Sequence, residues 1–349
     1  MAAALKHLLR HVPLLMALLA SMCVLASCDV HEFPDEPTPP EPVRIMKINL
    51  VFDREMPIHQ EIEYTEEGKR TRSAMLMRRY IIRIFPISRG EVTRAPVNEW
   101  IFVRDAESHP DASFTIDFPE GEYNMLVWSD FVDVDAHTDK HYDTSDFEEI
   151  KLAHLDNYSG SDETREAYRG VVDIKADTSA ITVDMERPMP RYVFITTDVD
   201  QFIKTEANSP GRRSSSSADA ADAGVQLSDY RVRITYPRYM AYSFNMFNDR
   251  PADSRTGVYF DSEIKRVDDK TAEIGFDYVF LNHHDTSINV SVEVYDRATG
   301  VILARIKPTD VPLSRSKLTV VRGAFLTTKN VGGAGIDPDF DGEFNIEIK

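Results

Sequence analysis

The side chains best placed to bind a metal ion lie near the C-terminus. Asp337, Asp339 and Asp341 take alternate positions and Gly342 follows, as in a calcium loop that wraps oxygen ligands around the ion. The twelfth position of such a loop should be a bidentate glutamate, whereas here it is Ile348. A turn of solvated aspartates between two strands explains the same residues. Calcium therefore stays a minor alternative, and we expect neither a metal site nor a cofactor.

Histidines and nucleophiles give no stronger candidate. His137 and His141 lie four residues apart among aspartates and would share one face only in a helix, for which the sequence shows no pattern. We expect an acidic loop there, and likewise at 282–285, Asn-His-His-Asp. The chain has no Gly-x-Ser-x-Gly elbow and no phosphate-binding glycine loop. We therefore predict no catalytic residue and no enzymatic activity.

Cys28 is the residue whose chemistry the sequence indicates most directly. It ends the tetrapeptide Leu-Ala-Ser-Cys, and it follows Lys6, Arg10 and the apolar run 14–26. That run is shorter than the ~18 residues of a membrane-spanning helix, which indicates a secretion signal at 1–27. The ending resembles the lipobox of bacterial lipoproteins, in which the cysteine is acylated with chains such as palmitate. A signal anchor with an incidental cysteine is the alternative.

The charge of the chain limits its partners. Removal of residues 1–27 would leave 322 residues and change the formal charge from −18 to −20, because it takes away two bases and no acid. Such a chain repels phosphate backbones and anionic headgroups, so we expect no nucleic acid partner. The expected contact with the lipid bilayer is the acylated Cys28. Because Cys23 lies in the signal, the mature chain cannot form an internal disulfide.

Residues 28–43 form an acidic segment with five prolines. Proline favours extended backbone, so the segment is predicted to be a stiff tether. Asp29 and Glu32 directly follow the cysteine and resemble the export signal that sends some Bacteroidetes lipoproteins to the cell exterior. A solvated acidic linker explains them equally well. The expected location is the outer membrane, lipid-anchored and exposed at the surface.

Alternating apolar residues predict strands along most of the remaining chain. In the first half these are 46–52, 79–87, 100–103, 114–118, 123–128 and 170–184, of which 123–128 is apolar on both faces and is expected to be central. Pro86 suggests an edge or a bulge. A short helix is predicted near 145–155 from the capping box at Ser145. In the second half we expect strands at 192–197, 230–236, 272–281, 288–295, 301–307, 318–326 and 344–348.

Short strands with almost no helical periodicity predict an all-β fold of two tandem antiparallel β-sandwiches. The break at 187–190, Arg-Pro-Met-Pro, sets the predicted boundary between domains 44–187 and 188–349. Within the second domain, the Ser-rich stretch 207–224 is predicted to be a disordered surface loop.

Several motifs together resemble the fimbrillin-like lipoproteins of Bacteroidetes, which include fimbrial anchors and minor subunits. The motifs are 119–130 (PEGEYNMLVWSD), 165–170 (REAYRG), 187–192 (RPMPRY), 239–247 (YMAYSFNMF) and the end from 311 to 348. The resemblance implies two tandem sandwiches of transthyretin-like or immunoglobulin-like type, a lipid anchor, a role in cell adhesion, and other fimbrial or surface subunits as partners. The Ser-rich loop departs from it.

Two functional hypotheses follow. The first is an anchor or minor structural subunit of a fimbria-like assembly, and the second is a lipidated surface module that binds glycan or a protein partner. For assembly, the candidate is the last strand, where Phe344, Ile346 and Ile348 share one face; pairing within its own domain is the alternative. For glycan, a platform could form from aromatic residues, namely Trp100, Trp128, Tyr158, Tyr168, Tyr239 and Tyr242. Most of them lie in apolar alternation, however, so we expect these to pack in the core.

Overall fold

The computed structural model describes residues 43–55, 77–105, 111–133, 139–209, 224–282, 285–328 and 345–348. From Val43 onward the chain forms one compact unit. Apart from one α-helix and three 3-10 turns, the regular elements of its described residues are strands, which confirms the predicted all-β class.

The first sheet of the unit has three strands in the order β10-β1-β5. β1 (Val43–Phe52) lies between β5 (Ala112–Pro119), which is antiparallel to it, and β10 (Ala180–Met185), which is parallel. The alternation predicted for β1 is confirmed, because Met46, Ile48, Leu50 and Phe52 are all buried. The opposite face of β1 points to solvent, as expected for an outer sheet of a sandwich.

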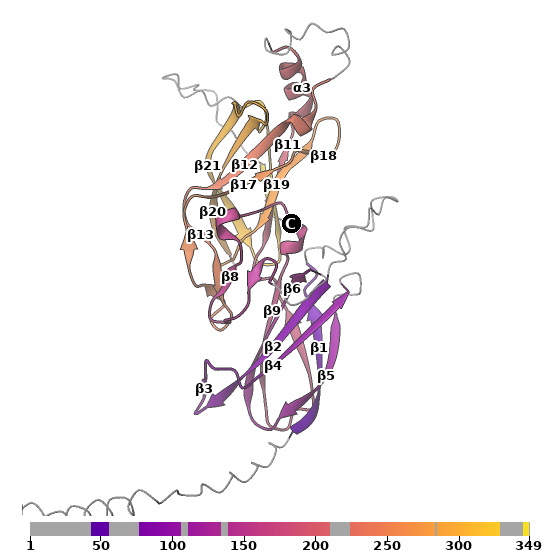
Figure 1. Ribbon diagram of the computed structural model, residues 1–349, viewed down its shortest axis with the longest axis vertical. Coiled ribbons are helices and arrows are strands. Elements are labelled where there is room, and N and C mark those ends of the chain that lie inside the picture. Colours follow the sequence, from indigo (N-terminus) through magenta and orange to yellow (C-terminus); the bar gives the residue numbers. More distant parts are fainter. Residues whose placement is uncertain are drawn as a thin grey trace, which may run out of the picture. The chain divides into compact units, whose positions relative to one another are not determined.

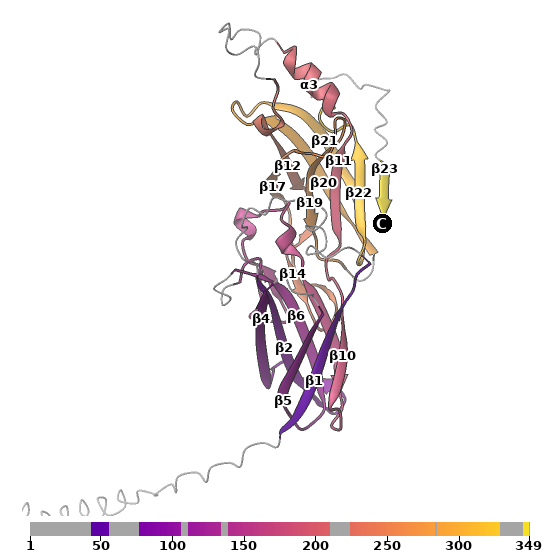
Figure 2. The ribbon, with the colours of Figure 1, turned by 90° about the vertical axis from the view of Figure 1, so that its right-hand side faces the viewer.

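A second sheet packs against the first (Figures 1 and 2). It contains β2 (Met77–Ser88), β6 (Tyr123–Val132) and β9 (Tyr168–Ile174), with β3 (Glu91–Val92) and β4 (Asn98–Asp105) both paired to β2. Pro86 is therefore not on an edge strand. Pro86 lies opposite the irregular stretch between β3 and β4, where the ladder is interrupted. The missing backbone N–H of Pro86 therefore removes no hydrogen bond of the ladder.

Gly170 allows this sandwich to close on its other side. A Cβ at this position would lie 2.5 Å from Val183 Cγ1 and 2.6 Å from Met185 Sδ, so only glycine lets β10 approach β9 this closely. The approach is completed by the bridge between Arg169 and Glu186, whose backbone N–H and C=O groups exchange two hydrogen bonds of 2.8 Å.

The C-terminal half contains two larger sheets. One has the order β18-β19-β11-β22-β23 and the other β17-β12-β20-β21. Most pairs are antiparallel, as predicted, but β11 and β22 are parallel. The bounds of the first sheet are β11 (Arg191–Thr196), β18 (Lys265–Arg266), β19 (Ala272–Tyr278), β22 (Leu318–Gly323) and β23 (Asn345–Ile348). Those of the second are β12 (Tyr230–Tyr236), β17 (Val258–Ser262), β20 (Asp285–Asp296) and β21 (Ile302–Ser314).

The two ends of these sheets differ. β21 ends the second sheet and carries Pro308 and Pro312, whereas β23 ends the first sheet and is only four residues long. Figure 2 shows β23 beside β22, at the outer side of its sheet.

Small elements connect the sheets. β7 (Tyr142–Asp143), β8 (Ile150–Leu152), β14 (Ser243–Asn245) and β15 (Arg250–Pro251) form a four-stranded sheet, and β13 (Met240–Ala241) pairs with β16 (Ser254–Arg255). Three 3-10 turns are η1 (Leu155–Asn157), η2 (Glu163–Arg165) and η3 (Leu227–Asp229).

The helix predicted near 145–155 is absent, and this prediction was wrong. The Asp143 and Asp146 carboxylates instead accept hydrogen bonds from the backbone N–H groups of Ser145 and Glu148, two residues further along, which favours turns. Ile150 then enters β8, which pairs with β14. A helix that the sequence analysis missed is α3 (Val199–Ala207), which buries only Val199 and Phe202.

β6 is buried on both faces, and this joins the two halves of the chain. Met125 and Val127 face a first core between the two N-terminal sheets. Leu126 and Trp128 face a second core, which continues through the loop segment 142–167 into the C-terminal sheets as far as Leu326. This double burial explains why 123–128 is apolar on both faces. The predicted domain boundary at 187/188 stays a prediction.

We predict that Trp128→Ala lowers the free energy of unfolding by ~3–5 kcal/mol, because it opens a cavity in the second core. Although Trp128 lies in the N-terminal half, the unfolding transition should shift as a whole and remain single. Denaturant titration followed by fluorescence and by far-UV circular dichroism would measure this. Ile101→Ala, at an exposed position on β4, is the matched control and should change stability by less than ~0.5 kcal/mol. Two separate transitions, of which only one moves, would show independent domains instead.

Candidate functional site

The segment 158–169 contributes two buried charged side chains, Arg165 and Glu166. It contains η2 and the start of β9, and its side chains reach both cores. Asp162 caps η2 by accepting a hydrogen bond of 2.9 Å from the Thr164 N–H. This short turn directs Arg165 and Glu166, which are neighbours in sequence, into two separate buried clusters.

Glu166 is the centre of the first cluster. Its Oε1 accepts hydrogen bonds from Arg187 Nη2 at 2.8 Å and from the Tyr168 hydroxyl at 3.1 Å. Its Oε2 accepts one from Arg78 Nη2 at 3.1 Å. Burial opposes ionisation of Glu166, but the two arginines outweigh it and hold the pKa of the carboxyl below its usual value. Glu166 is therefore ionised and paired, and it links β2 to the segment that follows β10.

Asp277, on β19, is the centre of the second cluster. Its Oδ2 accepts hydrogen bonds of 2.5 Å from the hydroxyls of Tyr158 and Tyr236, and Arg165 Nε lies 3.5 Å from Oδ1. Burial raises the pKa of Asp277, with Arg165 and the two tyrosine hydroxyls opposing that shift. Tyr192 extends the network through a hydroxyl-to-hydroxyl contact of 2.5 Å with Tyr236.

These clusters hold the structure together and leave no place for a substrate. Arg165, Glu166, Arg187 and Asp277 are at most 4% exposed, and each carboxylate already has its donors. Glu163 adds a third connection across the same region, because it accepts hydrogen bonds from Arg191 at 2.6 Å and from the Tyr278 hydroxyl at 3.0 Å. A truncation of either partner in such a buried pair leaves an uncompensated charge.

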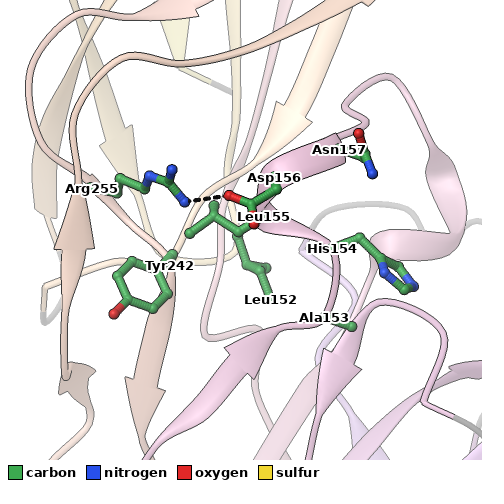
Figure 3. Close-up of a pocket in the computed structure, with 8 residues that line it drawn as sticks. All are labelled: Leu152, Ala153, His154, Leu155, Asp156, Asn157, Tyr242 and Arg255. Atoms are coloured by element: carbon green, nitrogen blue, oxygen red, sulfur yellow. Dashed lines mark hydrogen bonds and ion pairs between the residues drawn. The ribbon is translucent and has the colours of Figure 1, made fainter.

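An open hollow of about 480 Å³ lies beside these clusters, at the turn that follows β8 (Figure 3). Leu152 and Leu155 lie in its centre, between Tyr242 and Arg255 on one side and His154 and Asn157 on the other. Arg255 Nη1 and Asp156 Oδ1 are 2.8 Å apart, and the Tyr242 hydroxyl donates to Asp253 Oδ2 at 2.5 Å. The pairing of β8 with β14 brings these two distant parts of the sequence together.

Several residues singled out from the sequence lie outside the described residues. They are Cys28, Asp29 and Glu32, the calcium candidates Asp337, Asp339 and Asp341, and also His137 and Phe344. His141 is described, and it contacts Thr164 and Asp162. Within the described ranges, no group of three or more His, Cys, Asp or Glu side chains is arranged to hold a metal ion. No helix among those residues is long and apolar enough to cross a membrane.

The C-terminal strand pairs within its own chain in this structure. β23 runs antiparallel to β22, with Ile346 opposite Val321, and the half-buried Ile346 side chain packs against the second core.

Four of the six aromatic residues considered for a sugar platform pack in or against the cores, as expected. Trp128, Tyr158 and Tyr168 are buried, and Trp100 stacks on Phe118 at a ring distance of 5.8 Å. Of the six residues, Tyr239 is well exposed and Tyr242 lines the hollow.

The packed sheets define a body of β-sandwich type. The chain belongs to a family described as "Family of unknown function (DUF6562)", whose model matches residues 41–349. A comparison with curated proteins finds no match.

Solved structures that resemble the chain include fimbrial and adhesion proteins. The fimbrial anchor protein Mfa2 from Porphyromonas gingivalis is 12% identical, and the alignment covers 87% of this chain and 97% of that one, with a TM-score of 0.39. A candidate adhesin from Bacteroides thetaiotaomicron is 10% identical over 88% and 96% of the two chains, with a TM-score of 0.42. A candidate cell adhesion protein from Bacteroides uniformis is 10% identical over 90% and 99%, with a TM-score of 0.39.

We predict that Arg165→Ala destabilises the protein by ~3–5 kcal/mol, because Asp277 would remain buried without its cation. Denaturant titration measures the change. Lys204→Ala, which removes an exposed cation on α3, is the matched control and should cost less than ~0.5 kcal/mol. The double variant Arg165→Met with Asp277→Asn should recover part of the loss. A cost below ~1 kcal/mol for Arg165→Ala would contradict a role for this pair in holding the fold.

Stability should also depend on pH through His141. Burial lowers the pKa of His141 to about 4, against the opposing charge of Asp162 and with the help of Arg165 and Lys140. The unfolded imidazole titrates near 6.5, so between pH 6.5 and pH 4 the unfolded state binds a proton that the folded state does not. The free energy of unfolding is therefore fully retained above pH 6.5 and decreases as the pH falls towards 4. Urea denaturation across that window should show a falling free energy of unfolding, with a flatter dependence in His141→Gln. The exposed His154→Gln is the control and should keep the original slope; equal slopes in all three proteins would refute this prediction.

Proposed function

We propose that this protein is a non-enzymatic surface lipoprotein that anchors a fimbria-like assembly or forms a minor structural subunit of it. Acylation at Cys28 would attach it to the outer membrane, and residues 28–43 would hold the body away from the bilayer. Asp29 and Glu32 would contribute the signal for export to the surface. The sequence motifs that resemble the fimbrillin-like lipoproteins support this proposal.

The observation that carries the assembly role is the position of β23. It is a short strand at the end of a sheet, and only Asn345–Ile348 pairs with β22. A strand in this position can be exchanged for one from a neighbouring subunit, or its outer edge can accept one, because main-chain hydrogen bonds provide affinity and alternate side chains provide specificity. The partners would be other fimbrial or surface subunits.

The body has the properties that a mechanical connector requires. Its two cores meet at β6, and the buried pair of Arg165 with Asp277 connects η2 to the C-terminal strand β19. A load applied through the tether at Val43 would therefore pass from the first core into the second through packed strands. This continuous packing favours a structural role over that of a binding module.

Two variants test the anchor and the assembly separately. Cys28→Ala should move the protein from the membrane fraction to the soluble fraction, because acyl chains contribute ~0.8 kcal/mol per buried methylene. Removal of residues 344–349 should leave the protein in the membrane but abolish the recovery of partner subunits after mild detergent extraction. Membrane fractionation and co-purification measure the two effects, and a synthetic peptide of residues 344–349 should restore stability to the shortened protein.

Ile302→Ala is the control for the strand removal, since it changes an exposed residue on β21, at the end of the other sheet. It should retain both the membrane location and the partners. The proposal fails if the Cys28→Ala protein stays with the membrane, or if the shortened protein recovers the same partners as the full-length chain.

A further inference from the structure

The hollow between the β8 turn and the β13–β16 hairpin has the composition of a ligand site, although no charged motif in the sequence indicated one. Its volume, about 480 Å³, falls within the ~300–1,000 Å³ typical of small-molecule sites. Unlike the clusters around Glu166 and Asp277, it is open to solvent, and it presents polar side chains whose hydrogen-bonding capacity is not used.

Two of these side chains are free in the described part of the chain. His154 and Asn157 are exposed, and neither side chain has a hydrogen-bond partner among the described residues. Together they offer an imidazole and an amide, which can both donate and accept. A ligand that fits them must therefore carry groups that also act as donor and acceptor, as hydroxyl groups do.

The centre of the hollow is apolar. Leu152 and Leu155 lie between the polar side chains in Figure 3, and Tyr242 stands at one side with its hydroxyl directed to Asp253. Since that hydroxyl is already bonded, the ring is held in place and offers its surface to a ligand. The ligand should therefore have an apolar face next to its hydroxyl groups.

The charges around the hollow are compensated. Arg255 is paired with Asp156, and Lys151 with Glu149 at 3.0 Å. An anionic ligand would meet the Asp156 carboxylate and would compete with it for Arg255, whereas a cation would compete with Arg255 for Asp156. A neutral ligand avoids both costs and can still hydrogen-bond to the outer atoms of this ion pair.

We infer that the hollow binds a neutral saccharide, with its C–H face against Tyr242 and Leu155 and its hydroxyl groups towards His154, Asn157 and the Arg255–Asp156 pair. Because the hollow is open, it takes one or two residues of a longer chain and does not enclose a free sugar. This inference does not depend on the anchoring role, and either can be wrong without the other.

The test is saturation-transfer NMR and calorimetric titration of the full-length protein with soluble oligomers of glucose, galactose, mannose and N-acetylglucosamine. Sialyllactose and glucose 6-phosphate serve as anionic comparisons. At least one neutral oligomer should bind, and the anionic sugars should bind at least about tenfold more weakly. Tyr242→Ala and Asn157→Ala should each weaken binding of that oligomer by about tenfold.

Tyr259→Ala is the matched control, because Tyr259 is an exposed tyrosine on β17 that does not line the hollow. It should leave binding unchanged. Asn157→Ala guards against misfolding, since Asn157 is exposed and its side chain makes no hydrogen bond to a described residue. The inference is overturned if no neutral oligomer binds, if the anionic sugars bind better, or if Tyr259→Ala weakens binding as much as Tyr242→Ala. It is also overturned if the Tyr242 and Asn157 variants lose a protein partner while no sugar binds.

Discussion

A carboxylate that is removed from water must find its cation inside the fold, and this requirement shapes the middle of the molecule. Glu166 and Asp277 are both fully buried, and both depend on arginines that come from elsewhere in the chain. Glu166 needs Arg78 from the start of β2 and Arg187 from the segment after β10, while Asp277 needs Arg165. Arg78, Glu166 and Arg187 all lie in the N-terminal half, so their cluster fixes segments of that half against one another. Arg165 reaches Asp277 only when η2 lies against β19 of the C-terminal sheet. The Arg165–Asp277 pair therefore specifies how the two halves meet, even though its net contribution to stability can be small.

Apolar burial provides the stability that the ion pairs do not. β6 has nine of its ten residues buried, and its two faces contribute to different cores. The segment 142–167 supplies the apolar cover for the outer face, with Tyr142, Phe147 and Ile150 packed in the second core. A strand that is buried on both faces behaves as the interior strand of a three-layer structure, and loss of either layer would expose it. The Glu166 and Asp277 clusters occur where these layers meet.

The strands could be predicted from the sequence because their apolar residues alternate. The pattern at 46–52 places β1 correctly, and the two-faced pattern at 123–128 correctly makes β6 central. The segment 142–167 could not be predicted in this way, because its apolar residues fill gaps between sheets and follow no period. The capping box at Ser145 was a local signal that tertiary pairing of β8 with β14 overrode. Val199, Phe202 and Ile203 have the i, i+3, i+4 spacing of a helix, but α3 was missed because the stripe is only one turn long and buries two residues.

Some residues of the buried clusters stood out in the sequence only because they belong to motifs that resemble the fimbrillin-like lipoproteins. Arg165, Glu166 and Arg187 belong to two of the motifs that identified the family likeness, but nothing in their spacing indicates which of them pair. The pairs join residues 21 to 112 positions apart, for example Arg187 with Glu166 and Arg165 with Asp277, so that only the fold brings them together. The hollow beside Tyr242 had no signal at all, because two strand pairings create it from residues that are unremarkable in sequence.

The two prolines of β21 have a consequence for how the body meets its neighbours. A proline has no amide hydrogen, so a strand laid against the outer edge of β21 would lack donors at Pro308 and Pro312. β23, at the end of the other sheet, contains no proline in its four residues. The addition of a strand is thus disfavoured at the β21 edge and remains available at the β23 edge. Of these two edges, only β23 keeps an amide hydrogen at every residue.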